Sequence, residues 1–188
     1  MEIEVIKIDL KEFKEQLYPT YKELFPAYER KSLKMIKDLV VDGCTSLYKF
    51  VIEGDLVGFS IIHQIENNPY IMVEYFAILP ELQNKGYGTL CAYKLKEIYK
   101  NLKGLTVEVE KPDNNDLLKE RRIKFYERLG LKKVNVEFRL FDVEFYPYVW
   151  NFSNSVDTDA DIIKYMFDIY RRTLGKELTE KYCKVIKL

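Results

Sequence analysis

The chain has 188 residues, of which 47% are hydrophobic and 32% are charged, and its 30 basic residues balance its 30 acidic residues. This length and composition suit a single globular domain. The zero net charge argues against a generic nucleic-acid-binding protein, which usually has a basic excess, and no apolar run approaches the ~20 residues that cross a membrane. We therefore expect no nucleic-acid partner and no membrane partner.

The three cysteines, Cys44, Cys91 and Cys183, are far apart in the sequence and lack the spacing of a metal site. We therefore expect no metal. Reduced thiols fit the cytoplasm, which is the compartment that we predict.

The N-terminal part of the chain predicts one strand and two helices. Residues 4–10 read as a strand, and residues 11–41 have the apolar periodicity of a helix. Pro19 and Pro26 interrupt that periodicity, and a proline inside a helix removes a hydrogen bond and clashes with the preceding turn. Two helices with a bend between them are therefore expected.

A hairpin and a further strand follow. Residues 46–52 and 56–65 predict two strands, joined by a turn at Glu53-Gly54-Asp55 in which glycine supplies the turn conformation. Asn67-Asn68-Pro69 marks a second turn, and residues 71–79 predict the next strand.

The second half of the chain alternates helices and strands, which is typical of an α/β fold with a mixed sheet. The expected elements are a helix from Gly88 to about residue 102, a strand over 105–110, a helix that is capped among Asp113–Asp116 and ends at Leu129, and strands near 132–141 and 144–150.

The C-terminal part is predicted to be an addition to this arrangement. Residues 151–159 are polar and read as a linker, and residues 160–174 predict an amphipathic helix. We therefore expect a main domain over residues 1–150 and a C-terminal linker and helix over residues 151–188. The helix packs on the domain or forms an oligomer contact, so a homodimer is an open alternative.

The most informative segment joins the strand at 71–79 to the following helix. Gln83, Gly86 and Gly88 stand at the spacing Gln-x-x-Gly-x-Gly just before the helical pattern opens. The first N–H groups of a helix have no intrahelical partner, and together with the helix dipole they favour phosphate groups. Both glycines are expected to take positive φ and to let a ligand approach the backbone closely. The sequence thus predicts a phosphate-binding loop.

This loop resembles the acyl-CoA-binding motif of the GNAT superfamily of N-acetyltransferases. A second segment, Phe125-Tyr126-Glu127-Arg128-Leu129-Gly130-Leu131, resembles the end of the family's fourth helix, with Leu131 in place of the usual Phe. A third, Phe25-Pro26-Ala27-Tyr28-Glu29-Arg30, is similar to a segment between the family's first two helices. The resemblance covers roughly residues 3–150. It implies a GNAT-like mixed, splayed central sheet of about seven strands flanked by helices, here with an additional C-terminal helix.

The resemblance also implies the ligand and the reaction. Acetyl-CoA is expected to donate its acetyl group to a primary amine by direct attack, and the acceptor is a small-molecule or peptide amine whose identity is not encoded in a readable motif. Backbone N–H groups of Ala77 and Ile78 are expected to face the thioester carbonyl or the pantetheine arm. The cofactor-binding residues implied in this way are Phe76, Ala77, Ile78, Gln83, Asn84, Lys85, Gly86, Tyr87, Gly88, Thr89 and Tyr126.

Three residues are candidates for catalysis. Glu74 is the first candidate for the base, because strand alternation predicts an apolar face shared with Phe76, which should raise its pKa. Glu108 is the second candidate, and Glu110 on the same strand face is expected to be solvated. Tyr126 corresponds to the family's helix-borne tyrosine, which implies that it protonates the leaving thiolate.

His63, the only histidine, has no Ser or Cys motif nearby that would make a triad, so we expect it to be structural. A non-catalytic acyl-CoA-binding module for sensing or scaffolding is the rival to the enzyme. Such a module would keep the Gln83–Gly88 loop but would not need Glu74 or Tyr126.

Overall fold

The computed structural model describes residues 2–112, 116–152 and 157–187. The chain forms two compact units, which we call unit 1 (Met1–Gln64 and Val73–Ile98) and unit 2 (Ile65–Met72 and Tyr99–Leu188). Within the described ranges, no helix combines the length and the apolar character needed to cross a membrane.

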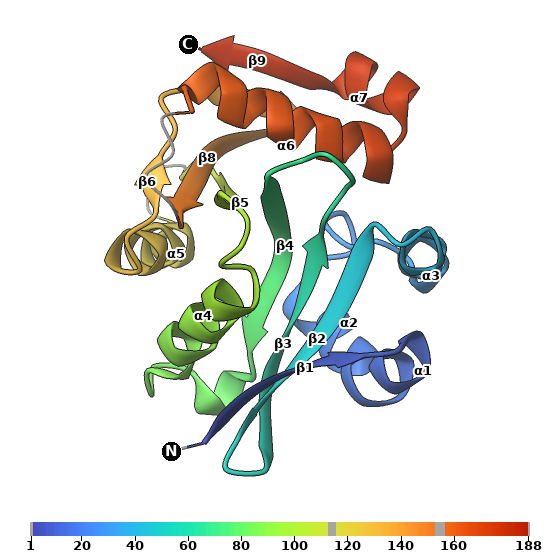
Figure 1. The fold of residues 1–188 in the computed structure, drawn as a ribbon, viewed down its shortest axis with the longest axis vertical. Coiled ribbons are helices and arrows are strands. Elements are labelled where there is room, and N and C mark those ends of the chain that lie inside the picture. Colours follow the sequence, from blue (N-terminus) through green and yellow to red (C-terminus); the bar gives the residue numbers. More distant parts are fainter. Residues whose placement is uncertain (1, 113–115, 153–156, 188) are drawn as a thin grey trace. The chain divides into compact units, whose positions relative to one another are not determined.

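Unit 1 is a layer of strands with helices on both faces (Figure 1). Its strands are β1 (Ile3–Ile8), β2 (Thr45–Ile52), β3 (Asp55–His63) and the larger part of β4 (Tyr70–Ile78). The first three pair antiparallel in chain order, and β4 is next to β3. The β2–β3 hairpin turns at Glu53 and Gly54, whose φ angles of 52° and 87° fit a two-residue loop.

The N-terminal helical segment is more continuous than its prolines predict. It runs through α1 (Leu10–Glu12), a π-helical turn η1 (Phe13–Leu17) and α2 (Tyr18–Leu24) before α3 (Leu33–Val41) begins. Pro19 does not end the segment, because it occupies the first turn of α2, where its missing N–H costs nothing. The backbone N–H of Tyr18 donates to the carbonyl of Phe13, five residues earlier, so the helix continues through this wider turn up to the proline.

The core of unit 1 lies between α1–α3 and the strands, and α4 (Tyr87–Ile98) covers the other face (Figure 1). Aromatic rings dominate this core, so it is rich in edge-to-face contacts such as Tyr21 on Tyr75, whose centroids are 5.0 Å apart. Its buried members are Ile8, Phe13, Leu17, Tyr21, Ile36, Leu47, Phe59, Ile61, Tyr75 and Ala77.

The described part of unit 2 contains the start of β4 and five further strands. They are β5 (Gly104–Glu110), β6 (Lys132–Lys133), β7 (Glu137–Leu140), β8 (Val143–Asn151) and β9 (Cys183–Lys187). The parallel ladder between β4 and β5 covers only the three pairs from Tyr70–Gly104 to Met72–Thr106, as a splayed sheet requires. β8 pairs antiparallel with β5, β6 and β7, and β7 also pairs with β9.

The described residues therefore form the expected mixed α/β sheet, but with nine strands instead of about seven. The predicted strand at 132–141 is two strands, because the N–H of Asn135 leaves the ladder and donates to Asp159 at 2.9 Å. Its partner strand β8 carries Pro147, which has no N–H to return a hydrogen bond. The short helix α7 (Lys176–Tyr182) and strand β9 were not predicted, because β9 is short and four of its five residues are exposed.

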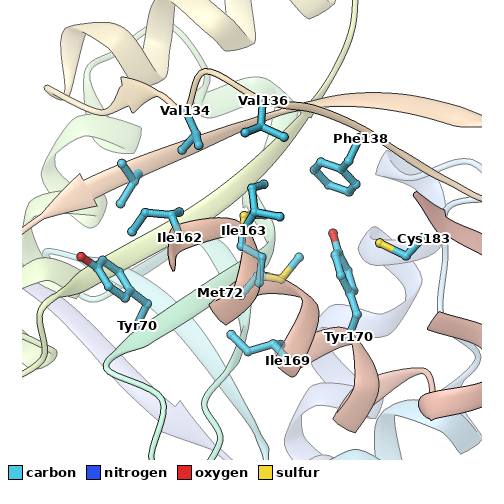
Figure 2. Packing of buried hydrophobic residues seen from close by; sticks show 12 residues of the cluster. Tyr70, Met72, Val134, Val136, Phe138, Ile162, Ile163, Ile169, Tyr170 and Cys183 are labelled. Atoms are coloured by element: carbon cyan, nitrogen blue, oxygen red, sulfur yellow. The ribbon is translucent and has the colours of Figure 1, made fainter. Parts of the chain in front are cut away.

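The predicted C-terminal helix exists as α6 (Asp159–Thr173), and it packs into the core of unit 2. Thr158 and Asp161 form a capping box at its start. Figure 2 shows Ile162, Ile163, Ile169 and Tyr170 of this helix against residues from β4, β7, β9 and the segment before β7. The buried members of this core are Tyr70, Met72, Val134, Val136, Phe138, Val149, Ile162, Ile163, Met166, Ile169, Tyr170 and Cys183.

One buried hydroxyl in this core, that of Tyr170, has no hydrogen-bond partner among the described residues. The Tyr170 side chain is only 3% exposed. A buried unsatisfied polar group costs about 1–3 kcal/mol, so Tyr170→Phe should raise the free energy of unfolding by about that amount in urea titrations.

Tyr70→Phe is the matched control from the same core. Its hydroxyl donates to Asp157 at 2.8 Å, so the same substitution should lower the free energy of unfolding by about 1 kcal/mol. Equal destabilisation by both substitutions would contradict the assignment of Tyr170.

Candidate functional site

The predicted phosphate-binding loop connects β4 to α4 in unit 1. The chain leaves β4 at Ile78, makes a 3-10 turn η2 (Pro80–Leu82), and enters α4 at Tyr87. Asn84 and Gly86 have φ angles of 62° and 84°, so the loop reverses through two left-handed positions. The side chain of Gln83 donates to the carbonyl of Ile78 at 3.1 Å. This glutamine therefore ties the loop to the end of the strand.

The loop presents backbone donors at the start of α4. The carbonyl of Gly86 accepts from Thr89 and Leu90, so helical hydrogen bonding begins there. Among the described residues, the N–H groups from Asn84 to Gly88 have no hydrogen-bond partner. Together with the positive end of the helix dipole, such a row of donors is suited to an anion.

The two glycines of the motif differ in conformation. Gly86 has the positive φ that was expected, and a Cβ built on it would meet nothing within 4 Å. Gly88 lies in the first turn of α4, so the expectation of positive φ is wrong for this residue. What Gly88 contributes is the absence of a side chain beside the exposed N–H groups.

Glu74 is held by two basic side chains inside unit 1. Its Oε1 pairs with Nζ of Lys31, and its Oε2 is 2.7 Å from Nε2 of His63. The other ring nitrogen of His63 is 2.8 Å from the hydroxyl of Thr45. The side chains of Lys31, Glu74 and His63 are only 8%, 11% and 1% exposed. His63 is thus part of a buried network, and both oxygens of Glu74 are engaged.

The apolar face predicted for Glu74 is not the face that it occupies. His63, its partner, alternates along β3 with Ile61, which belongs to the core under α1–α3. Phe76 instead contacts Phe50, with ring centroids 5.1 Å apart, and alternation places Phe50 on the other face. Glu74 and Phe76 therefore lie on opposite faces, and β4 departs from regular alternation between them.

The electrostatic setting of Glu74 is also the reverse of the one expected. Burial raises its pKa, but the charge of Lys31 and the interaction with His63 outweigh burial and lower the pKa from 4.5 to about 2. The predicted upward shift is wrong, because the sequence did not reveal that a lysine would share the site. At neutral pH the group is an ionised carboxylate of low basicity.

The backbone of β4 near Ala77 is closely packed against β3. A Cβ added to Gly58 would lie 2.1 Å from the carbonyl oxygen of Ala77, so only glycine allows this approach. The hydroxyl of Ser60 donates to the carbonyl of Tyr75 at 2.8 Å. The direction expected for the N–H groups of Ala77 and Ile78 stays a prediction.

Tyr126 lies in unit 2, near the end of α5 (Leu117–Arg128). Gly130, with φ of 90°, donates to Glu127, and Leu131 donates to the carbonyl of Tyr126. These two bonds form a Schellman motif, so the Gly of the predicted pattern ends the helix just after Tyr126. Burial raises the pKa of Tyr126, Arg122 opposes this shift, and Glu108 adds to it.

The two glutamates of β5 have different surroundings. Glu108 is half-buried and close enough to Tyr126 to influence its pKa. Glu110 lies 2.9 Å from Nζ of Lys119 on α5, with 12% of its side chain exposed. The expectation of a solvated Glu110 is therefore wrong, because the helix that covers β5 supplies a lysine.

Lys31 is the residue that sequence reasoning missed. It follows the Phe25–Arg30 segment directly, but it is 43 residues from Glu74 in the sequence. The only available signal was a lysine next to a recognised segment, and lysines are usually solvated.

The low pKa of Glu74 predicts a pH dependence of stability. A carboxylate with a lowered folded-state pKa stabilises the protein fully above its unfolded value of 4.5, and this contribution is lost as pH falls toward 2. Between pH 6 and pH 3, the parent should lose about 2 kcal/mol more stability than Glu74→Gln. Urea unfolding at both pH values measures the difference.

Glu81→Gln, at an exposed position, is the control and should lose as much stability as the parent. Equal losses in all three proteins would contradict the burial of an ionised Glu74.

This chain matches one protein family by sequence and several solved structures by fold. The sequence profile described as the acetyltransferase (GNAT) family matches residues 10–131, whereas no curated protein sequence matches significantly. A structure assigned to the GNAT acetyltransferases of Bacteroides thetaiotaomicron is similar, with a TM-score of 0.74 and 23% identity, over 93% of this chain and 99% of that one.

Two further structures have lower identity and show likeness of fold. The ribosomal-protein-S18-alanine N-acetyltransferase of Escherichia coli has a TM-score of 0.60 and 14% identity, over 83% of this chain and 97% of its own. A chimeric spermidine N-acetyltransferase built in part from the Vibrio cholerae enzyme has a TM-score of 0.63 and 13% identity, over 88% of this chain and 99% of its own. With the profile match over most of its length, the chain belongs to the GNAT family of acetyltransferases.

Proposed function

We propose that the protein is an N-acetyltransferase that transfers the acetyl group of acetyl-CoA to a primary amine by direct attack. The observation that carries this proposal is the row of unpartnered N–H groups from Asn84 to Gly88 at the start of α4, in a chain of the GNAT family. The similar structures include enzymes named for a polyamine and for a protein alanine. A small-molecule or peptide amine is accordingly the proposed class of acceptor.

The residues of the β4–α4 loop fit the phosphate end of acetyl-CoA. The N–H groups of Lys85, Gly86 and Tyr87 offer hydrogen bonds to a pyrophosphate, and the helix dipole favours its charge. The side chains of Asn84, Lys85 and Gln83 are exposed, and Thr89 is in the first turn of α4. When bound, acetyl-CoA supplies an acetyl thioester, whose carbonyl carbon accepts the amine and whose sulfur leaves as a thiolate.

Tyr126 is the proposed proton donor to that sulfur. Burial and the nearby Glu108 raise the pKa of the phenol above its usual value near 10, so its Oη holds a proton at neutral pH. The Schellman motif fixes the backbone at Tyr126, from which the ring projects.

The proton of the acceptor ammonium needs a different destination from the one first expected. Glu74 is a weak base, because Lys31 and His63 stabilise its ionised form. Glu108, acting through water, or the solvent itself is therefore the proposed acceptor of this proton. Glu108→Gln, assayed across pH with amines of different pKa, separates these two routes: the solvent route predicts parent-like profiles.

Gly86→Val tests the loop. Valine is a poor occupant of φ near 84° and adds bulk beside the donors, so CoA affinity should fall about tenfold or more, as expected when a charge-assisted hydrogen bond is lost. Gly54→Val is a matched control, because Gly54 has φ of 87° and equally open surroundings but lies in the β2–β3 turn. Calorimetry with CoA should find parent affinity in Gly54→Val only; parent affinity in both would remove the loop from the site.

Tyr126→Phe tests the acid. The ring is kept and only the hydroxyl is lost, so turnover should fall by about 10² to 10⁴, with little change in CoA affinity or melting temperature. Tyr148→Phe is the control. Tyr148 lies on β8, and its hydroxyl donates at 3.4 Å to Glu127, the residue that follows Tyr126 on α5. Thiol-release assays over a panel of amines give the rates. If Tyr126→Phe works at the parent rate where chemistry limits turnover, the solvent protonates the thiolate.

A further inference from the structure

Three lysines of unit 2 meet around the ring of Tyr146 on β8. The ammonium of Lys133 on β6 lies 3.1 Å from the ring centroid, and that of Lys111, which follows β5, lies 5.9 Å from it. Lys187 of β9 joins them through Glu137 of β7, because its Nζ is 3.6 Å from Oε1 of that carboxylate. Positive charges from three separate segments are therefore close enough to repel one another.

The carboxylates of this cluster contact only two of the three lysines. Nζ of Lys111 is 2.8 Å from Oε2 of Glu137 and 3.4 Å from Oε2 of Glu144. Lys187 is near the other oxygen of Glu137. Within the described ranges, Lys133 forms no ion pair, and its ammonium contacts an aromatic ring instead. Lys133 is thus the lysine of this cluster whose charge no carboxylate compensates by direct contact.

The surroundings of Lys133 favour its uncharged form. Partial burial lowers the pKa of this amine, and the charges of Lys187 and Lys111 lower it further, against the opposing effect of Glu137. The ring of Tyr146 attracts an ammonium, but Lys111 shares that ring. Hydrogen bonds to its carboxylate partners raise the pKa of Lys111 itself. Lys133 therefore offers a lone pair more readily than Lys111, and it is exposed to solvent.

We propose that Lys133 is a modification site at which acetyl-CoA in solution acetylates the protein. The lone pair of Nζ forms a bond to the acetyl carbonyl carbon, and the bond from that carbon to sulfur breaks. The sulfur leaves as a thiolate and takes up the proton that the nitrogen loses. The product is an uncharged acetamide, so one of the three like charges is removed. This reaction takes place outside the β4–α4 loop, so it goes beyond the proposed function and does not rest on it.

The first experiment compares Lys133 with Lys132, the neighbouring exposed lysine of β6, whose side chain alternation places on the opposite face. The parent is labelled with a limiting amount of acetic anhydride, and peptide mass spectrometry gives the acetylation rate of each lysine. At about pH 7, Lys133 should react about threefold faster than Lys132 or more, because a lower pKa leaves more of the neutral amine. The excess should disappear toward about pH 10, where both amines lose their protons. Acetyl-CoA in place of the anhydride should show the same preference for Lys133.

Two variants test the origin of this preference. Lys111→Met removes a repelling charge and leaves Glu137 available to Lys133, so acetylation of Lys133 should slow by about threefold or more. Lys187→Met should slow it as well, and it leaves the ion pairs of Lys111 in place. Lys184→Met is the matched control, since Lys184 is another exposed lysine of β9 whose ammonium lies on the carbonyl of Glu180. It should leave the rate at Lys133 unchanged.

Three results would overturn the proposal. The first is an anhydride rate at Lys133 that does not exceed the rate at Lys132 near neutral pH. The second is a parent-like rate at Lys133 in both Lys111→Met and Lys187→Met, and the third is equal modification of Lys132 and Lys133 by acetyl-CoA. A failure of the proposed function is seen separately, as the absence of acetylated product from a panel of free amines, because the labelling needs no acceptor amine.

Discussion

The buried carboxylate of Glu74 is the constraint around which unit 1 is organised. A charge in the middle of a strand is tolerated only if its hydrogen bonds and its charge are both compensated. Lys31 and His63 supply this compensation from two other elements. Because a buried, unpaired charge is so unfavourable, the position of Glu74 also decides where the segment between α2 and α3 must run and which way the ring of His63 must face. One strand residue thus links β4, β3 and the loop after α2.

The loop before α4 follows from a simpler requirement. A chain that leaves a strand and enters a helix within a few residues has backbone groups that neither element can satisfy. In this protein the side chain of Gln83 satisfies the strand end, and the left-handed Asn84 and Gly86 turn the chain into the helix. The N–H groups that remain are the ones that an anionic ligand can use. The ligand site is therefore a by-product of how the strand is joined to the helix.

Unit 2 positions its candidate acid by helix termination and not by packing alone. The hydrogen bonds donated by Gly130 and Leu131 end α5 two residues after Tyr126, at Arg128, so the backbone at Tyr126 cannot shift along the helix axis without breaking them. The C-terminal helix α6 supplies much of the apolar core of the same unit. This segment lies outside the stretch that resembles the family, yet it buries side chains from β4 and from the segment around β7.

Local patterns in the sequence determined most of the elements, because turn residues, caps and apolar periodicity act within a few residues of one another. The hairpin at Gly54, the loop at Gln83–Gly88 and the end of α5 at Gly130 are of this kind, and the family motif coincided with two of them. The strand at 132–141 was missed as two strands because the diversion of Asn135 depends on Asp159, which is distant in sequence. Only the tertiary structure decided the state of Glu74: alternation along one strand cannot show that a lysine 43 residues away will reach the same carboxylate. A pKa depends on every charge that the fold brings near a group, and for charges far apart in the chain the sequence order does not give their distance.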